Sequence, residues 1–191
     1  MRQGNYSLEA LQMAVRAGEH FDYLFFWGHR PSSSGAITAS CFSQWWPSPF
    51  EVDGITYASA EHWMMAEKAR LFGDESTLLR ILSAKSPAEA KAFGRQVSGF
   101  NQQVWEENCF ESVCKGNVHK FSQHPELGEF LISTRTLVLV EASPVDRVWG
   151  IGLAQDDERA GDPLRWNGSN LLGFALMVVR DRIANINKTE E

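Results

Sequence analysis

The spacing of apolar residues along the chain is mainly helical. In residues 7–17, Leu8, Leu11 and Val15 recur at a helical interval after Ser7, a residue type that often caps a helix N-terminus. The same pattern, with a capping residue or an early proline at the start, predicts further helices over residues 59–73, 74–82, 86–95, 101–121, 125–132 and 170–183. Helices therefore dominate the predicted fold.

Three shorter segments indicate strands. Residues 21–27 are mostly aromatic, and residues 136–142 are rich in valine and leucine. Residues 50–57 alternate around Asp53-Gly54, the dipeptide favoured in two-residue hairpin turns. Together these patterns predict an α+β, helix-dominated single domain with a small antiparallel sheet.

Composition narrows the class of protein. The 191 residues fit one domain, 21–185, with an N-terminal helical extension, 1–20, and a polar tail, 186–191. No stretch approaches the roughly 20 apolar residues of a bilayer span, and no secretory signal is present, so we expect a cytoplasmic protein without a membrane partner. Three cysteines fit reduced thiols better than a disulfide framework. A net charge of -6 argues against a protein that coats nucleic acid non-specifically.

The predicted helix over residues 59–73 carries two charges inside its apolar stripe. Glu61 and Lys68 are seven residues apart, so they lie on nearly one line, roughly 10 Å apart along the axis, while His62 lies on the opposite face. Burying an uncompensated charge costs several kcal/mol. Either each charge is paired structurally elsewhere in the chain, or the two belong to a functional site.

These residue types suit covalent or glycosidic chemistry. A lysine whose ammonium form is disfavoured loses its proton near neutral pH and can attack a carbonyl or an opened sugar. Cleavage of glycosidic bonds usually draws on carboxylates, and Glu141 and Asp146 are the next candidates to reach such a site.

Seven blocks of sequence, in order and without large gaps, closely resemble the YbiA-like family, also called NADAR. They are FFWGH (25–29), SCFSQWWPSPFEVDGITYASAEHWMMAEKARLFGD (40–74), SPAEAKAFGR (86–95), KF (120–121), HPEL (124–127), LVEASPVDRVWGIGL (139–153) and NGSNLLGFALMVVR (167–180). The resemblance covers about residues 21–183.

The resemblance implies N-glycosidase chemistry on a bond between ribose C1 and a nitrogen. Lys68 corresponds to the lysine that attacks C1, forming a Schiff base, and Glu61 to the acidic residue beside it. Asp146 and Trp149 match the family's Asp-x-x-Trp-Gly block and are expected to line the site. Where many members have Ser-Asn-Phe-Tyr, this chain has Ser43-Gln-Trp-Trp46. The two tryptophans enlarge the aromatic surface expected at the site, so this departure bears on which substrate the protein binds.

Five residues are further substrate-binding candidates, and three of them, Trp46, Arg95 and Asn170, also have a structural alternative. Trp46 can stack on a base or fill the core, and Arg95 can bind a phosphate or be a solvated surface arginine. Gly150 lets the backbone approach a phosphate, Ser43 belongs to the departing block, and Asn170 can be a helix cap. We expect no cofactor and no metal, because Cys109, Cys114, His119 and His124 match no common zinc spacing.

Two hypotheses from different classes remain. The first is a cofactor-independent N-glycosidase whose partner is a ribosylated or phosphoribosylated small molecule, such as a riboflavin-pathway intermediate, or an ADP-ribosylated guanine in nucleic acid. The second is a non-catalytic module that binds ADP-ribose or a related nucleotide. A third possibility, a structural partner protein, predicts an exposed apolar patch and no small-molecule ligand.

Overall fold

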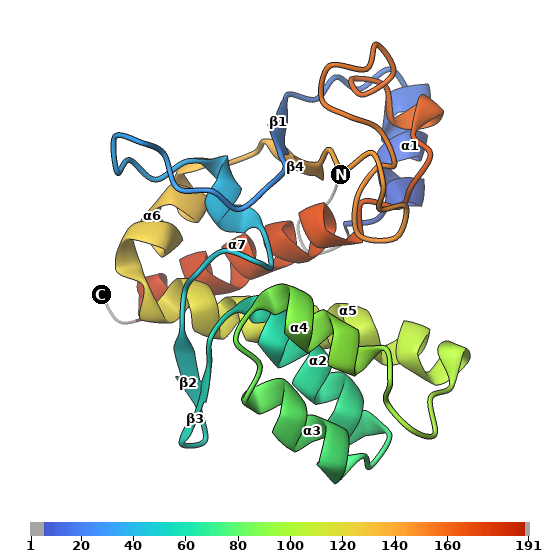
Figure 1. Cartoon of the computed structure of the whole chain (residues 1–191). Helices are drawn as coiled ribbons and strands as arrows, with labels where there is room; N and C mark the ends of the chain where they lie inside the picture. Colours follow the sequence, from blue (N-terminus) through green and yellow to red (C-terminus); the bar gives the residue numbers. More distant parts are fainter. Residues whose placement is uncertain (1–5, 190–191) are drawn as a thin grey trace. The chain divides into compact units, whose positions relative to one another are not determined.

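The computed structural model describes residues 6–189, with side chains for residues 6–186. The chain divides into two compact units (Figure 1). Unit 1 combines Met1–Ser43 with Pro125–Glu191, and unit 2 is the continuous segment Gln44–His124. Each unit is described by itself.

Unit 1 is built around two parallel strands. Strand β1 pairs with β4 in the register Tyr23↔Val138 to Phe26↔Glu141, although the strands are far apart in sequence. Helix α7 packs on β4 and on α6, and α1 packs on η2. The elements of unit 1 are α1 (Leu8–Arg16), β1 (Tyr23–Phe26), the 3-10 helix η1 (Ala39–Phe42), α6 (Pro125–Ser133), β4 (Val138–Glu141), the 3-10 helix η2 (Pro163–Arg165) and α7 (Leu171–Thr189).

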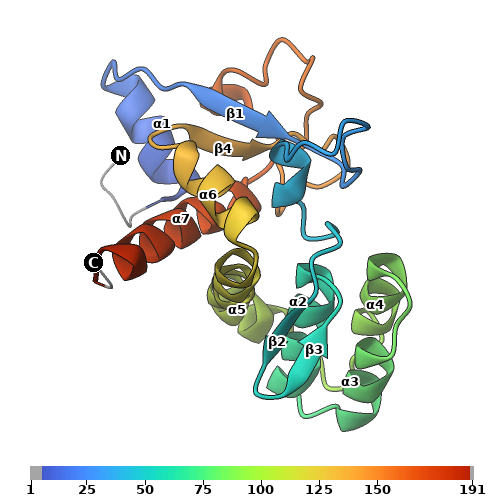
Figure 2. The ribbon, with the colours of Figure 1, turned by 90° about the vertical axis from the view of Figure 1, so that its left-hand side faces the viewer.

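Unit 2 is a helical cluster that carries a hairpin. Helix α2 lies among α3, α4 and α5, and β2 pairs with β3 in an antiparallel hairpin (Figure 2). Asp53 and Gly54 both have positive φ, as the turn between β2 and β3 requires. The elements of unit 2 are β2 (Phe50–Val52), β3 (Ile55–Tyr57), α2 (Ala60–Leu71), α3 (Glu75–Leu82), α4 (Pro87–Gly94) and α5 (Gln102–Gln123).

Side-chain caps fix where most of the helices begin. In α1, α3, α4 and α5 the residue before the helix accepts a hydrogen bond from a backbone N–H of the first turn, which satisfies an otherwise unpaired donor. The capping residues are Ser7, Asp74, Ser86 and Asn101. Ser59, which precedes α2, makes no such bond and contacts a histidine side chain instead.

The α+β, helix-dominated class and the hairpin are confirmed, and two details differ from the sequence prediction. The strands at 21–27 and 136–142 pair in parallel, because the long segment between them returns the chain to the starting edge before β4 begins. Helix α7 continues to Thr189, so residues 186–189, assigned to the polar tail, are helical, and residues 190–191 lie outside the described part. Within residues 6–189, no helix combines the length and apolar character needed to cross a membrane.

Gly173 lets α7 approach β4 closely. A Cβ atom at this position would meet the backbone carbonyl oxygen of Leu139 and the side-chain amide of Asn170. A strand carbonyl cannot swing aside as a flexible side chain can, so a larger residue at position 173 must push the helix away from the strand.

We therefore expect Gly173→Ala to lower the free energy of unfolding by about 1–3 kcal/mol, the usual penalty for overpacking. Urea denaturation would measure it. Gly161→Ala is the matched control, because a Cβ there meets no atom within 4 Å and φ is not positive, so it should change stability by less than about 0.5 kcal/mol. Equal stability of the two variants would contradict the close packing of α7.

Candidate active site

The first two turns of α2 are buried on every side. All residues from Ala60 to Ala66 are buried, Glu61 among them at 2% exposure. This includes His62, which the sequence places on the face opposite Glu61, because α3, α4 and α5 surround the helix (Figure 2). Polar side chains on α2 must therefore find partners inside unit 2 or be used by a ligand.

His62 has a structural role in this helix. Its Nδ1 lies 2.8 Å from Ser59 Oγ and its Nε2 lies 3.2 Å from the carbonyl oxygen of Ala84. Burial lowers the pKa of His62, so the ring is neutral near pH 7. The histidine thus ties the start of α2 to the segment between α3 and α4.

Glu61 lies in the first turn of α2, where a carboxylate is favoured by the partial positive charge of the helix end. Its backbone N–H donates to the carbonyl oxygen of Gln44 at 3.0 Å. The side chain of Gln44 is held in turn by Asn117, whose Nδ2 donates to Gln44 Oε1 at 2.8 Å. The backbone at Glu61 is therefore joined to a residue whose own side chain is held in the core of unit 2.

Lys68 lies in the last turn of α2 against aromatic rings. Its Nζ is 4.1 Å from the ring centroid of Phe100 and 5.7 Å from that of Trp105. Burial lowers the pKa of Lys68, and the positive charge of Arg95 lowers it further. Lys68 forms no ion pair with any residue that the structure describes. Burial and Arg95 thus shift Lys68 toward the neutral, nucleophilic amine.

The other predicted residues of unit 2 differ in exposure. Arg95, at the C-terminal cap of α4, is exposed and near enough to influence Lys68 electrostatically. Trp46 is 7% exposed, so its ring is largely within the unit. Trp63 is a core residue, and its ring centroid lies 5.0 Å from that of Tyr57.

Lys120 is a buried lysine to which the sequence analysis assigned no role. It is 0% exposed, and its Nζ lies 4.9 Å from the ring centroid of Phe121. Helical spacing could have indicated that Lys120 is buried. It follows Val113 by seven residues and Asn117 by three, so all three lie on the buried face of α5.

In unit 1, Asp146 organises the loop that follows β4. Its Oδ1 accepts hydrogen bonds from the backbone N–H groups of Val148 (2.9 Å) and Trp149 (2.8 Å). Its Oδ2 accepts none from the described residues, so this oxygen is available to a ligand hydroxyl. The loop lies at the carboxyl end of a parallel strand pair, the edge at which α/β folds usually bind ligands. Trp27, 59% exposed, follows β1 at the same edge.

Two more predicted residues support this loop from within. Gly150 is buried, and a Cβ there would lie 2.8 Å from the carbonyl oxygen of Glu141, so only glycine fits. Asn170 has φ 53°, and its side-chain amide forms hydrogen bonds with the backbone of β4 as a neighbouring strand would. Its Nδ2 donates to the carbonyl oxygen of Leu139, and its Oδ1 accepts from the N–H of Glu141, both at 2.9 Å.

Ser43, the last residue of the first segment of unit 1, is half-buried, and its N–H donates to the carbonyl oxygen of Ser40 in η1. The predicted site residues therefore fall into two groups. Unit 2 places Glu61 and Lys68 on one helix, with Arg95 beside Lys68. Unit 1 gathers Asp146, Trp149, Gly150 and Asn170 after β4.

Comparisons with known proteins identify relatives along most of the chain. The NADAR domain model matches residues 25–184. N-glycosidase R617 of Acanthamoeba polyphaga mimivirus is 40% identical over 164 residues, which cover 83% of this chain and 95% of that protein. N-glycosidase YbiA of Escherichia coli (strain K12) is 33% identical over 145 residues, covering 76% of this chain and 80% of YbiA. The NMR structure of the E. coli protein YbiA is similar with a TM-score of 0.66 at 30% identity, over 91% of this chain and 90% of that chain.

Arg95→Gln should raise the pKa of Lys68, because it removes a positive charge that favours the neutral amine. NMR titration of the Lys68 side chain would measure the change, which should shrink at high salt because Arg95 is exposed. Lys85→Gln removes an exposed charge of the same sign that does not perturb Lys68, so it should leave this pKa unchanged. An identical titration in wild type and Arg95→Gln would show that Arg95 does not act on Lys68.

Asn170→Ala should lower the free energy of unfolding by about 2–3 kcal/mol, because two hydrogen bonds to β4 are lost and alanine disfavours positive φ. Asn170→Gly loses the same bonds without the backbone strain, so it should be about 1 kcal/mol less destabilised. Denaturant melts of both variants would test this. If alanine and glycine were tolerated equally well, the left-handed backbone would not be a constraint at this position.

Proposed function

The chain belongs to the NADAR family, and on this premise we propose that it is an N-glycosidase, a hydrolase that cleaves the bond between C1 of a ribose and a nitrogen. Relatives that bear this name align with three quarters or more of the chain. The proposed substrate is a phosphoribosyl- or ADP-ribosyl-linked base, either a riboflavin-pathway intermediate or an ADP-ribosylated guanine.

The observation that carries the proposal is the setting of Lys68. Its pKa is lowered by burial and by Arg95, and its Nζ lies over the faces of two aromatic rings. An amine becomes a nucleophile only when it is unprotonated, so both influences act in the direction that covalent catalysis needs. The rings of Phe100 and Trp105 also suit the cation that forms when the amine bonds to a sugar carbon.

The proposed reaction consumes one water. The neutral amine of Lys68 attacks C1, and the bond from C1 to the base breaks, with its electron pair and a proton passing to the departing base. The bond from C1 to the ring oxygen then opens, the oxygen gains a proton, and a C1=Nζ iminium remains. Water adds to C1, the C1–Nζ bond breaks, and ribose and the amine are regenerated.

Two carboxylates complete the proposal. Glu61, on the same helix face as Lys68, is assigned to proton transfer, for which a buried acid is suited. Asp146 is assigned to orienting the sugar through Oδ2, since its Oδ1 is fixed by two backbone N–H groups.

The remaining predicted residues are assigned to substrate binding. Arg95 is assigned to a substrate phosphate and Trp149 to stacking on a base, because a guanidinium suits a phosphate and an indole suits a base. The binding assignments of Trp46, Ser43, Gly150 and Asn170 stay predictions.

Borohydride trapping tests the covalent step. Borohydride reduces an iminium to a stable secondary amine, so wild-type protein incubated with a ribosylated base should gain the mass of the reduced sugar on the peptide that contains Lys68. Lys68→Met should lose the adduct and reduce turnover by roughly a thousandfold or more, while methionine keeps the contact with the rings. Lys85→Met, at an exposed lysine, is the matched control and should trap normally.

Three outcomes would contradict parts of this proposal. An adduct on Lys120, the fully buried lysine of α5, would move the nucleophile to that residue. Turnover without an adduct on any lysine would exclude the covalent step. Tight binding of intact ligand with no released ribose, measured by calorimetry, would instead favour the non-catalytic nucleotide-binding module.

A further inference from the structure

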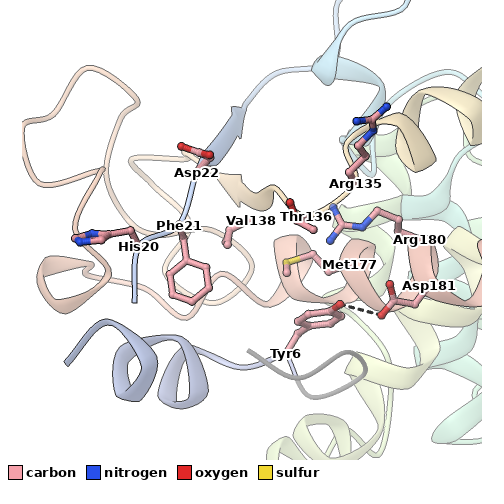
Figure 3. A pocket seen from close by; sticks show the side chains of 10 residues that line it. All are labelled: Tyr6, His20, Phe21, Asp22, Arg135, Thr136, Val138, Met177, Arg180 and Asp181. Carbon is pink, nitrogen blue, oxygen red and sulfur yellow. Dashed lines mark hydrogen bonds between the residues drawn. The ribbon is translucent and has the colours of Figure 1, made fainter. Parts of the chain in front are cut away.

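Unit 1 contains a cavity of about 510 Å³ away from the predicted site residues. Four of its lining residues, Tyr6, His20, Phe21 and Asp22, precede the segment matched by the NADAR model. The others come from the segment after α6, from β4 and from α7, and Figure 3 shows how they surround the space. Neither Lys68 nor Asp146 lines this cavity. It is therefore separate from the groups assigned to the reaction.

The wall of this cavity includes a buried cation, Arg180, that forms no salt bridge with the described residues. Arg180 is 5% exposed, and its Nη1 donates to Thr134 Oγ1 and to the carbonyl oxygen of Leu137, both at 2.9 Å. Its Nε has no hydrogen-bond partner, and it forms no ion pair with any residue in the described part of the chain. Asp181 is close, but its Oδ2 accepts from the Tyr6 hydroxyl at 2.9 Å (Figure 3).

Burial lowers the pKa of Arg180 although Tyr6 and Asp181 both favour its charged form, so these two neighbours offset only part of the cost of burying this guanidinium. A bound anion would remove much of that cost. The planar guanidinium also presents its N–H groups in a fixed fork, which fits the oxygens of a phosphate or a carboxylate.

A second arginine that lines the cavity, Arg135, has a strained backbone and an exposed side chain. Arg135 has φ 49°, a conformation in which glycine is favoured, and its N–H donates to the carbonyl oxygen of Ile132 at the end of α6. A non-glycine residue in this region costs of order 1 kcal/mol. Arg180 bonds to both flanks of the same turn, at Thr134 and Leu137, so it fixes the turn that carries Arg135 and Thr136, and all three residues line the cavity.

The rest of the wall is suited to an apolar ring. Phe21, Val138 and Met177 also line the cavity (Figure 3). The volume is far larger than a single inorganic anion needs, since a water molecule occupies about 30 Å³ of liquid. Hydroxyl and guanidinium donors suit a phosphate, which accepts more hydrogen bonds than a carboxylate. We propose that this cavity binds a small phosphate monoester whose aromatic or apolar group lies against Phe21 and Met177.

Phenyl phosphate is the simplest probe of this chemistry. Titrated into the full-length ¹⁵N-labelled protein, it should bind saturably and shift the backbone amide signals of Thr136, Val138 and Arg180. Phenol, which lacks the phosphate, and inorganic phosphate, which lacks the ring, should each bind at least about tenfold more weakly, since hydrogen bonds to charged groups and ring burial both contribute.

Variants at Arg135 localise the binding. Arg135→Gln should weaken phenyl phosphate binding by about tenfold, and Arg135→Gly should do the same while relieving the strained φ, so a loss of folding cannot explain both. Arg16→Gln, an exposed arginine of α1 that does not line the cavity, is the matched control and should bind as wild type does.

The proposal is overturned if phenyl phosphate shifts none of the three amide signals, or if it shifts only signals around Lys68 and Arg95. It is also overturned if phenol binds as tightly as phenyl phosphate, or if Arg135→Gln and Arg16→Gln bind equally well. These results do not depend on turnover, so they are independent of the N-glycosidase assay.

Discussion

The burial of α2 on all sides is the constraint on which the chemistry of unit 2 depends. A helix surrounded by α3, α4 and α5 has no solvent face over its first two turns, so each polar side chain needs a defined purpose. His62 is satisfied by Ser59 and the Ala84 carbonyl, and it holds the helix in position. Lys68, in the last turn of the helix, lies against the aromatic rings of Phe100 and Trp105. Burial thus provides both the rigidity of the helix and the altered acidity of its lysine.

In unit 1, the side chain of Asn170 completes the hydrogen bonding of a two-stranded sheet. Two parallel strands alone leave the outer edge of β4 unpaired, and Asn170 supplies the missing donor and acceptor through its amide. Gly173 then allows α7 to lie directly on the strand. The loop after β4 is held between the same elements, with Asp146 bonded to its own backbone, so its unused carboxylate oxygen has a fixed position.

Local signals in the sequence were enough for most of the elements, because their causes are local. Asp53-Gly54 specifies a hairpin turn, and Asp74 or Asn101 caps the helix that follows it. The parallel pairing of β1 with β4 depends on contacts between distant segments, which periodicity does not encode. Spacing identified Glu61 as buried, but it could not show that His62 on the opposite face is buried as well. Nor could it show which rings lie over Lys68, because these come from α5 and the segment before it.

Lys68 also experiences the electrostatics of its own helix. It lies in the last turn of α2, where the carbonyl end carries a partial negative charge that favours a nearby cation by about 0.3–1 kcal/mol. This acts against burial and Arg95, so the amine is held between opposing influences. A ligand that displaced water from the rings would deepen the burial and tip the balance toward the neutral form. Occupancy of the site would therefore move Lys68 in the same direction as burial and Arg95 do, toward the amine that can condense with a carbonyl.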